Sequence, residues 1–246
     1  VTIDRPDSDL NAVDDRLHHE LSRLFRRLQA EREARAVLLC GTETAFSAGG
    51  DFAWFPELQE PGRLADLHLD AKSLIWDLLD VHLPVVCALT GHAMGLGASV
   101  ALLCDVVVMA ETARLGDPHV KVGIVAGDGG TIAWPLAVGP MLAKRYLLTG
   151  DPVDAAEALR LGLVAETAPD AESCRKAGLA WAHRLAAGAP QAVQYTKQAV
   201  NAWIKETAGT TFDLAAALEI ATFATEDHAE ALASLAEKRQ PRFTGR

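Results

Sequence analysis

Two residues near the middle of the chain, His119 and Asp128, have side chains of the types needed to move protons. Both lie in a turn-rich stretch between Gly116 and Gly130. An imidazole titrates near neutral pH and can transfer a proton in either direction, and a nearby carboxylate can orient it or deliver a proton itself. Two simpler interpretations stay open, a hydrogen-bonded turn histidine and an aspartate that caps the helix expected after Gly129. The pair is therefore a candidate acid/base site.

Two glycine-bearing turns could bind the negative charge that such proton transfers create. Residues 46–51 have the sequence FSAGGD and follow an apolar stretch at 36–41, whereas residues 91–98 have the sequence GHAMGLGA and follow an apolar stretch at 84–90. Backbone N–H groups that point from two such turns to one place can form an oxyanion site, and each donor is typically worth roughly 3 kcal/mol in the transition state. The alternative is that these glycines only relieve backbone crowding. Two such amides can hold the charge of an enolate, for example that of a thioester, so the pairing favours an active site.

The segments around these motifs alternate between helix and strand, which predicts an α/β fold. An amphipathic helix is expected over residues 14–32, because leucines recur there on one stripe. A loop expected over residues 56–63 could form a wall of a substrate pocket. The other elements expected in this half are strands at 36–41, 84–90 and 105–110, a short segment near Leu115, and helices at 67–78 and 94–103.

The chain becomes mostly helical after Pro140. Helices are expected at 154–161, 173–187, 189–205, 211–224 and 226–238. Gly188 and Pro190 mark a boundary between the α/β core and a helical tail. We therefore expect residues 1–188 to form the core and residues 189–246 to form a C-terminal helical region.

The composition excludes several classes of partner. The chain has 246 residues, half of them hydrophobic, which suffices for one large domain or for a domain with a helical appendage. Its net charge of −10 and pI near 5.2 argue against nucleic acids and anionic membranes, because those partners need a clustered basic surface. No apolar run reaches the roughly 20 residues that span a bilayer, and no secretory signal pattern is present. The cytoplasm is the expected location.

No pattern in the sequence indicates a metal or a redox cofactor. The chain has neither HExxH nor a GxGxxG motif in the setting of a Rossmann unit. The cysteines lack CxxC spacing and are expected to be reduced core thiols. They are Cys40, Cys87, Cys104 and Cys174. The adjacent histidines at positions 18 and 19 are expected to face solvent.

In combination, the motifs resemble the enoyl-CoA hydratase/isomerase family, the crotonase superfamily, over nearly the whole chain. Besides the two glycine turns, the segments that occur in the family's order are IDRP at 3–6, LNA at 10–12, CD at 104–105, GIVAGDGGT at 123–131, LTG at 148–150, ALRLGLV at 158–164 and EKR at 237–239. The resemblance implies a spiral of ββα units, with a helical C-terminal region that contributes to oligomerisation and caps the ligand. It also implies an enzyme that assembles as a homotrimer or a dimer of trimers.

By motif match, the family's two oxyanion amides fall on Gly50 and Leu96. The second position is commonly glycine in the family, so Leu96 is a departure that affects the shape of the pocket. The resemblance places coenzyme A, as part of the substrate thioester, on backbone groups of Ala48 and Gly50 and beside Phe52. Lys238 matches a lysine that reaches a nucleotide phosphate in relatives, sometimes from a neighbouring subunit; the alternative is a solvated lysine at a helix end. No separate cofactor is expected to be required.

The catalytic glutamates of the family are missing. Hydratases of this family usually carry two glutamates, and the matching positions here are Ser99 and His119. A serine is no base near neutral pH without help, so the usual hydratase mechanism cannot be copied onto this chain. His119 and Asp128 instead resemble the branch of the superfamily that cleaves carbon–carbon bonds in β-diketones, which includes 6-oxocamphor hydrolase. In that branch a histidine activates water and an aspartate supports proton transfer to the enolate leaving group.

Three functions are consistent with these residues. The first is an enoyl-CoA hydratase or isomerase that uses His119 and Asp128, the second is a β-diketone hydrolase, and the third is an acyl-CoA-binding protein without turnover. A serine peptidase of the related Clp type is disfavoured, because Gly95 occupies the serine position and no GxSxG motif is present. Aromatic side chains that could line an apolar pocket or belong to the core are Trp54, Phe55, Trp76 and Trp134.

Overall fold

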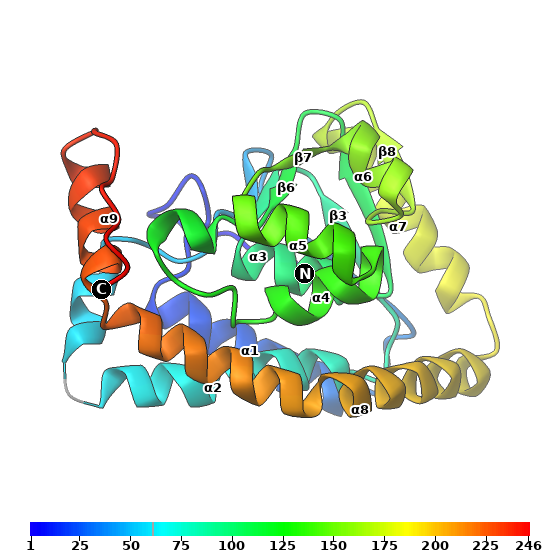
Figure 1. Cartoon of the computed structure of the whole chain (residues 1–246). Coiled ribbons are helices and arrows are strands. Elements are labelled where there is room, and N and C mark those ends of the chain that lie inside the picture. The colour runs from blue at the N-terminus through cyan, green and yellow to red at the C-terminus, as the bar shows by residue number, and fades with distance from the viewer. Residues whose placement is uncertain (61) are drawn as a thin grey trace.

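Short strands form two four-stranded sheets in the computed structural model, which describes residues 1–60 and 62–246 (Figure 1). The first sheet has the strand order β1-β3-β5-β8 and the second has the order β2-β4-β6-β7. The strands are β1 (Val37–Cys40), β2 (Ala45–Ser47), β3 (Val85–Leu89), β4 (His92–Met94), β5 (Val106–Ala110), β6 (Arg114–Gly116), β7 (Val153–Asp154) and β8 (Glu166–Ala168). From β1 to β6, consecutive strands therefore alternate between the two sheets.

This alternation builds a spiral of ββα units. The first sheet is parallel throughout, and Cys87 of β3 lies between Leu39 of β1 and Val107 of β5. The second sheet is parallel from β2 to β6, and β7 adds an antiparallel edge. After each of the first three strand pairs comes a helix, and these helices are α2 (Arg63–Leu79), α3 (Leu96–Leu102) and α4 (Gly130–Val138). The predicted α/β fold is confirmed.

The composition of the strands explains why the first sheet lies inside. All five residues of β3, the sequence VVCAL, are buried, as expected for a parallel strand covered on both faces. Helix α7 (Ala171–Ala186) packs on β1, β3 and β5. The cysteines behave as core thiols, because Cys40, Cys87 and Cys174 are buried, Cys104 is half-buried, and all four are free.

Three long helices lie side by side beneath the sheets in Figure 1. They are α1 (Asp15–Ala30), α2 and α8 (Pro190–Phe223), and α8 packs on both α2 and α4. Asp14 caps α1, because its Oδ1 accepts the N–H of Leu17 at 2.8 Å. The other helical elements are the 3₁₀ turns η1 (Phe55–Gln59) and η2 (His119–Val122), and the helices α5 (Pro140–Thr149), α6 (Ala155–Leu161) and α9 (Glu226–Ala236).

The prediction of two helices at 189–205 and 211–224 is wrong, because α8 is a single helix of 34 residues. Gly209 lies inside it without a break. A glycine in a helix interior costs only about 1 kcal/mol relative to alanine. The buried side chains of Ala208 and Phe212 on either side of Gly209 offset that cost by packing into the core.

The predicted loop over residues 56–63 is largely replaced by η1 and by the start of α2 at Arg63. Pro61 of that segment lies outside the described residues.

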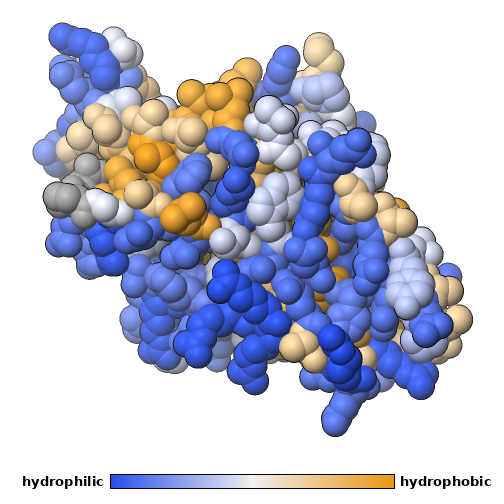
Figure 2. Space-filling model, turned by 90° about the horizontal axis from the view of Figure 1, so that it is seen from below, coloured by the Kyte–Doolittle hydropathy of each residue, from blue (hydrophilic) through white to orange (hydrophobic). Residues whose placement is uncertain are grey.

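Seen from below, the surface is mostly hydrophilic, with apolar side chains gathered in one area (Figure 2). The exposed large hydrophobic residues include Leu69 of α2 and Leu214 and Leu218 of α8. Within the described part of the chain, no helix has both the length and the apolar character needed to cross a membrane.

Candidate active site

The four residues predicted to act in catalysis line one pocket. Gly50, Leu96, His119 and Asp128 all contribute to its wall, although they come from four separate segments of the chain. The rest of the lining is mainly apolar. It includes Phe55 and Leu58 of η1, Leu67 and Ala71 of α2, and Ile220 and Phe223 of α8. The structure thus brings both glycine turns and the acid/base candidates to one apolar cavity.

The first glycine turn is held by the N-terminal segment. The N–H of Val13 donates to the carbonyl oxygen of Gly49 at 2.8 Å, and the N–H of Asp51 donates to the carbonyl oxygen of Val13 at 2.9 Å. The guanidinium of Arg5 donates to Oδ2 of Asp51 at 2.7 Å. Between these fixed points, the N–H of Gly50 forms no hydrogen bond with any described residue.

The second glycine turn leaves another backbone donor free. Leu96 is the first residue of α3, and its N–H has no acceptor among the residues that the structure describes. Gly95 precedes it with φ of +52°, a conformation that favours glycine. A Cβ atom at Gly95 would lie 3.1 Å from Cε1 of His119, so the absence of a side chain also makes room for the imidazole.

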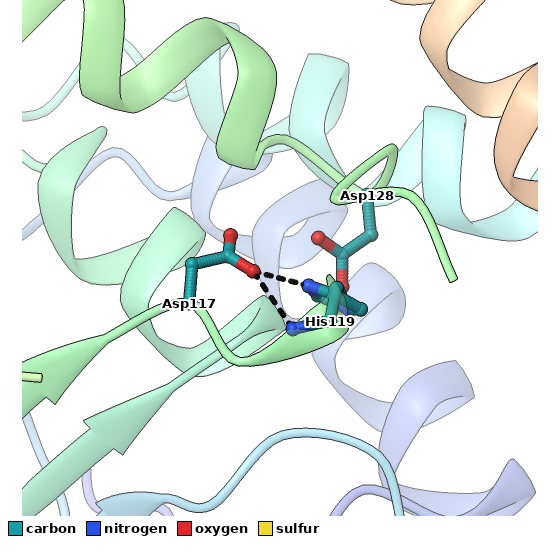
Figure 3. A group of neighbouring side chains, drawn as sticks. All are labelled: Asp117, His119 and Asp128. Carbon is teal, nitrogen blue, oxygen red and sulfur yellow. Dashed lines mark hydrogen bonds and ion pairs between the residues drawn. The ribbon is translucent and has the colours of Figure 1, made fainter. Parts of the chain in front are cut away.

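His119 lies between two carboxylates (Figure 3). Its Nδ1 is 2.5 Å from Oδ1 of Asp117, and its Nε2 is 3.3 Å from Oδ2 of Asp128. The Oγ of Ser99 donates to Oδ1 of Asp128 at 3.4 Å. The alternative of Asp128 as a helix cap is wrong, because α4 begins at Gly130 and Gly129 provides no side-chain cap. His119 is indeed a hydrogen-bonded turn histidine, and it also faces the pocket.

The two carboxylates determine the charge of His119. Burial alone would lower the pKa of the imidazole, but the charges of Asp128 and Asp117 and hydrogen bonds with both outweigh burial. The pKa of His119 is therefore raised well above its usual value. The raised pKa favours the imidazolium form, and a proton must leave the ring before it can act as a base.

Asp117 is a functional candidate that the sequence analysis missed. Its side chain is fully buried, and Oδ2 has no hydrogen-bond partner among the described residues. A Cβ atom at Gly130 would lie only 2.1 Å from this Oδ2, so glycine is required at the start of α4. The sequence offered a way to find it, because Asp117 comes only two residues before His119 on the same turn.

Glu219 is a second candidate that the sequence did not reveal. It comes from α8, lines the pocket and is 8% exposed. Its carboxyl group forms no hydrogen bond with the described part of the chain. Burial and the negative charge of Asp128 raise the pKa of Glu219 well above its usual value, which favours the protonated form. A Cβ atom at Gly127 would lie 2.6 Å from Cβ of Glu219, so this glycine lets α8 approach the turn.

Among the aromatic residues singled out in the sequence, one prediction, that for His18, needs correction. His19 is exposed as predicted, but His18 is buried and lines the pocket, because it faces inward from α1. Trp54 and Phe55 line the pocket as well. The two other tryptophans that were predicted as candidates, Trp76 and Trp134, lie outside its described lining. Trp134 is fully buried against Tyr146, and Trp76 packs edge-on against Phe212.

The acid/base cluster could also be considered as a metal site. Asp117, His119 and Asp128 each offer one ligand atom, and these atoms lie within 4.8 Å of one another. However, Asp117 faces Nδ1 of the ring and Asp128 faces Nε2. One ion can bind only one nitrogen of the same imidazole, so it could not use all three groups together. The geometry suits protons held between ring and carboxylates.

The residues expected to contact coenzyme A occupy two separate regions. Ala48 and Gly50 lie on the first glycine turn, and Phe52 is 47% exposed next to it, with its ring edge-on against Phe55. Lys238 follows α9, is exposed, and lies outside the described lining of the pocket. Their role in binding coenzyme A stays a prediction.

Comparison with known proteins identifies the family. The sequence profile of one family, enoyl-CoA hydratase/isomerase, matches residues 1–246. The chain belongs to this enzyme family. It is 32% identical over 247 residues to a probable enoyl-CoA hydratase of Mycobacterium bovis, covering all of this chain and 94% of that relative. It is 33% identical over 252 residues to the 2,3-dehydroadipyl-CoA hydratase of Escherichia coli, with 100% and 94% covered.

Solved structures of the enoyl-CoA hydratase/isomerase family share the fold. A crystal structure of an enoyl-CoA hydratase/isomerase from Mycobacterium paratuberculosis matches with a TM-score of 0.89 and 39% identity, covering 95% of this chain and 92% of that one. An enoyl-CoA hydratase/isomerase from Pseudoalteromonas atlantica matches with a TM-score of 0.86 and 30% identity, covering 99% and 94%. The predicted crotonase-like architecture is therefore confirmed.

Proposed function

We propose that this protein adds water to the double bond of an α,β-unsaturated acyl-CoA thioester. One observation carries the proposal: two backbone N–H groups without acceptors among the described residues, those of Gly50 and Leu96, belong to the same pocket as His119 and Asp128. Donors of this kind stabilise an enolate oxygen, because they are fixed before the charge develops. Names of similar proteins support the thioester, since several of them are enoyl-CoA hydratases.

In this mechanism, the thioester carbonyl oxygen accepts hydrogen bonds from the N–H groups of Gly50 and Leu96. His119 in its imidazole form takes a proton from water as the water oxygen bonds to Cβ, and the electrons of the double bond move onto the thioester as an enolate. Asp117 keeps the ring oriented throughout. The protonated carboxyl of Glu219 then delivers a proton to Cα, and the imidazolium returns its proton to Glu219 through solvent.

A second candidate is hydrolysis of a carbon–carbon bond in a β-diketone. It is favoured by the histidine held between two aspartates where the family's hydratases usually carry glutamates. Water, deprotonated by His119, would attack one carbonyl carbon. The bond to the central carbon then breaks, and the enolate of the other carbonyl leaves into the amide pair and is protonated at carbon.

Mass spectrometry of products formed in heavy-oxygen water distinguishes the two reactions. The purified protein and its His119→Ala variant are incubated with a panel of enoyl-CoA thioesters and cyclic β-diketones. The leading proposal predicts heavy oxygen in an intact hydroxyacyl-CoA, lost in the variant. Heavy oxygen in a ring-opened acid would instead establish the second candidate. No labelled product from either class would contradict both.

For binding of coenzyme A, the proposal keeps the contacts implied by the family. Backbone groups of Ala48 and Gly50 would contact coenzyme A as it crosses the first glycine turn, the ring of Phe52 would lie near the adenine, and Lys238 would bind a phosphate as a point charge. The test is calorimetric titration with coenzyme A. Lys238→Met should weaken binding, whereas unchanged affinity would remove Lys238 from the site.

The assembly we propose is a homotrimer or a dimer of trimers, with residues 189–246 taking part in the contacts. Large apolar side chains exposed on this single chain support an interface, since Tyr195 is 59% exposed and Trp203 is 57% exposed, both on α8. Sedimentation equilibrium should give a mass three or six times that of the chain. A monomer at micromolar concentration would contradict this assembly.

A further inference from the structure

Two polar groups of the apolar pocket have no use in the fold or in the proposed proton transfers. The first is the indole of Trp54, which lines the pocket and is 8% exposed. Its Nε1–H is buried and has no acceptor among the described residues. A buried donor without a partner costs about 1–3 kcal/mol. The position therefore favours a molecule that brings an acceptor with it.

The second group is the imidazole of His18, which is 3% exposed. Neither of its ring nitrogens forms a hydrogen bond with a residue that the structure describes. Its ring centroid lies 6.3 Å from that of Trp54, so one small polar group could contact both rings. Burial lowers the pKa of His18, and the neutral ring offers one donor and one acceptor.

The two rings form a defined part of the cavity. Trp54 and His18 also line a second depression, which is more polar and includes Asp15 and Asp70, so they form the wall between the two hollows. Leu58 and Leu67 belong to the same wall, because they also line both hollows. Outside the acid/base cluster, the polar side chains in the described lining of the pocket are these two rings and His68 of α2.

We propose that Trp54 and His18 form a subsite for a neutral oxygen acceptor, a ketone in the first place, on the part of the substrate that does not react. The indole requires an acceptor, because it can only donate. An anionic acceptor is disfavoured, since Asp15, Asp70 and Asp128 already place negative charge near His18. This inference rests on the proposed function and specifies its substrate class as an oxygenated rather than a plain hydrocarbon chain.

The test compares pairs of enoyl-CoA thioesters that differ in one chain methylene replaced by a ketone, with the ketone placed at successive positions. For each pair, the ratio of kcat/KM between the ketone and the methylene member is measured. Affinities of the corresponding saturated thioesters are measured by calorimetry, so that binding is read without turnover. The variants are Trp54→Phe and His18→Leu. Their matched controls are Trp76→Phe, outside the described lining, and His19→Leu, on the exposed side of α1.

At one ketone position the wild-type ratio should exceed one, and Trp54→Phe and His18→Leu should each lower it about 3- to 10-fold, the worth of one net hydrogen bond. The control variants should keep the wild-type ratio. A ratio near one at every position in both kcat/KM and affinity would overturn the subsite. A ratio lowered equally by the controls would overturn it as well. If neither member reacts while the affinity difference persists and depends on Trp54, the subsite is supported and the proposed reaction is wrong.

Discussion

The two halves of the candidate site are built in different ways. The oxyanion half consists of backbone N–H groups at Gly50 and Leu96, each placed by a glycine turn that directly follows a strand. The acid/base half consists of side chains, and it combines Asp117 and His119 of one turn with Asp128 of the next and Glu219 of α8. A backbone site depends on the conformation of its turns rather than on the type of side chain present. A side-chain cluster depends on long-range packing and can be retuned by one substitution.

The largest effect is expected from removal of the ring in the acid/base half. His119→Ala should lower kcat between about 10²- and 10⁴-fold, the usual contribution of a positioned acid or base. Steady-state kinetics check this, with His119→Asn as a second variant that still offers a donor to the buried Asp117. The exposed His19→Ala serves as control and should keep wild-type kcat. A loss below fivefold in both His119 variants would mean that the ring moves no proton.

A smaller effect, with a diagnostic pH dependence, is expected from Asp117→Asn. Because the pKa of His119 is raised, the imidazole form needed as base accumulates only as pH rises above the usual histidine range. Loss of the Asp117 charge should lower this pKa and move the rising limb of kcat/KM to lower pH, while kcat falls about 10-fold or more for lack of orientation. The control Asp151→Asn removes an exposed carboxylate near Lys121 and should leave the limb in place. An unmoved limb in Asp117→Asn would show that Asp117 does not set the charge of the ring.

Much of the candidate site could be predicted from the sequence. The residues that could not be predicted are those whose position depends on how distant segments pack. The two glycine turns could be recognised because they follow apolar stretches, and the motif match to the family then assigned the oxyanion amides to Gly50 and Leu96. Glu219 could not, because its position among the residues of a mostly exposed helix gives no sign that one turn packs over Gly127. His18 was misjudged for the same reason, since its neighbour His19 is exposed and only the packing of α1 on α2 decides which of them turns inward.

The buried acid makes a prediction about stability. A group whose folded pKa is raised contributes stability that is present below its unfolded pKa and is lost as pH rises through the folded value. Glu219→Gln keeps the shape of the protonated acid but cannot ionise. Thermal unfolding should therefore show the variant gaining stability relative to wild type as pH rises from about 5 to about 9. Parallel curves across this range would contradict a buried, protonated Glu219.

The smallest effect concerns α8 away from the pocket. A Cβ atom at Gly209 would have no neighbouring atom within 4 Å among the described residues, so Gly209→Ala should raise the free energy of unfolding by about 0.5–1 kcal/mol. Urea unfolding measures this, and kcat should stay at the wild-type value. Destabilisation would mean that the helix is interrupted at Gly209 after all.

The central claim is that the N–H of Leu96 stabilises an oxyanion, and one pair of variants tests it directly. Leu96 is the first residue of α3, where proline is well tolerated because that N–H has no partner within the helix. Leu96→Pro therefore deletes the donor, whereas Leu96→Ala shortens the side chain and keeps the donor. Single-turnover rates should be about 10²- to 10³-fold lower for the proline variant than for the alanine variant. Equal rates in two folded variants would contradict the claim.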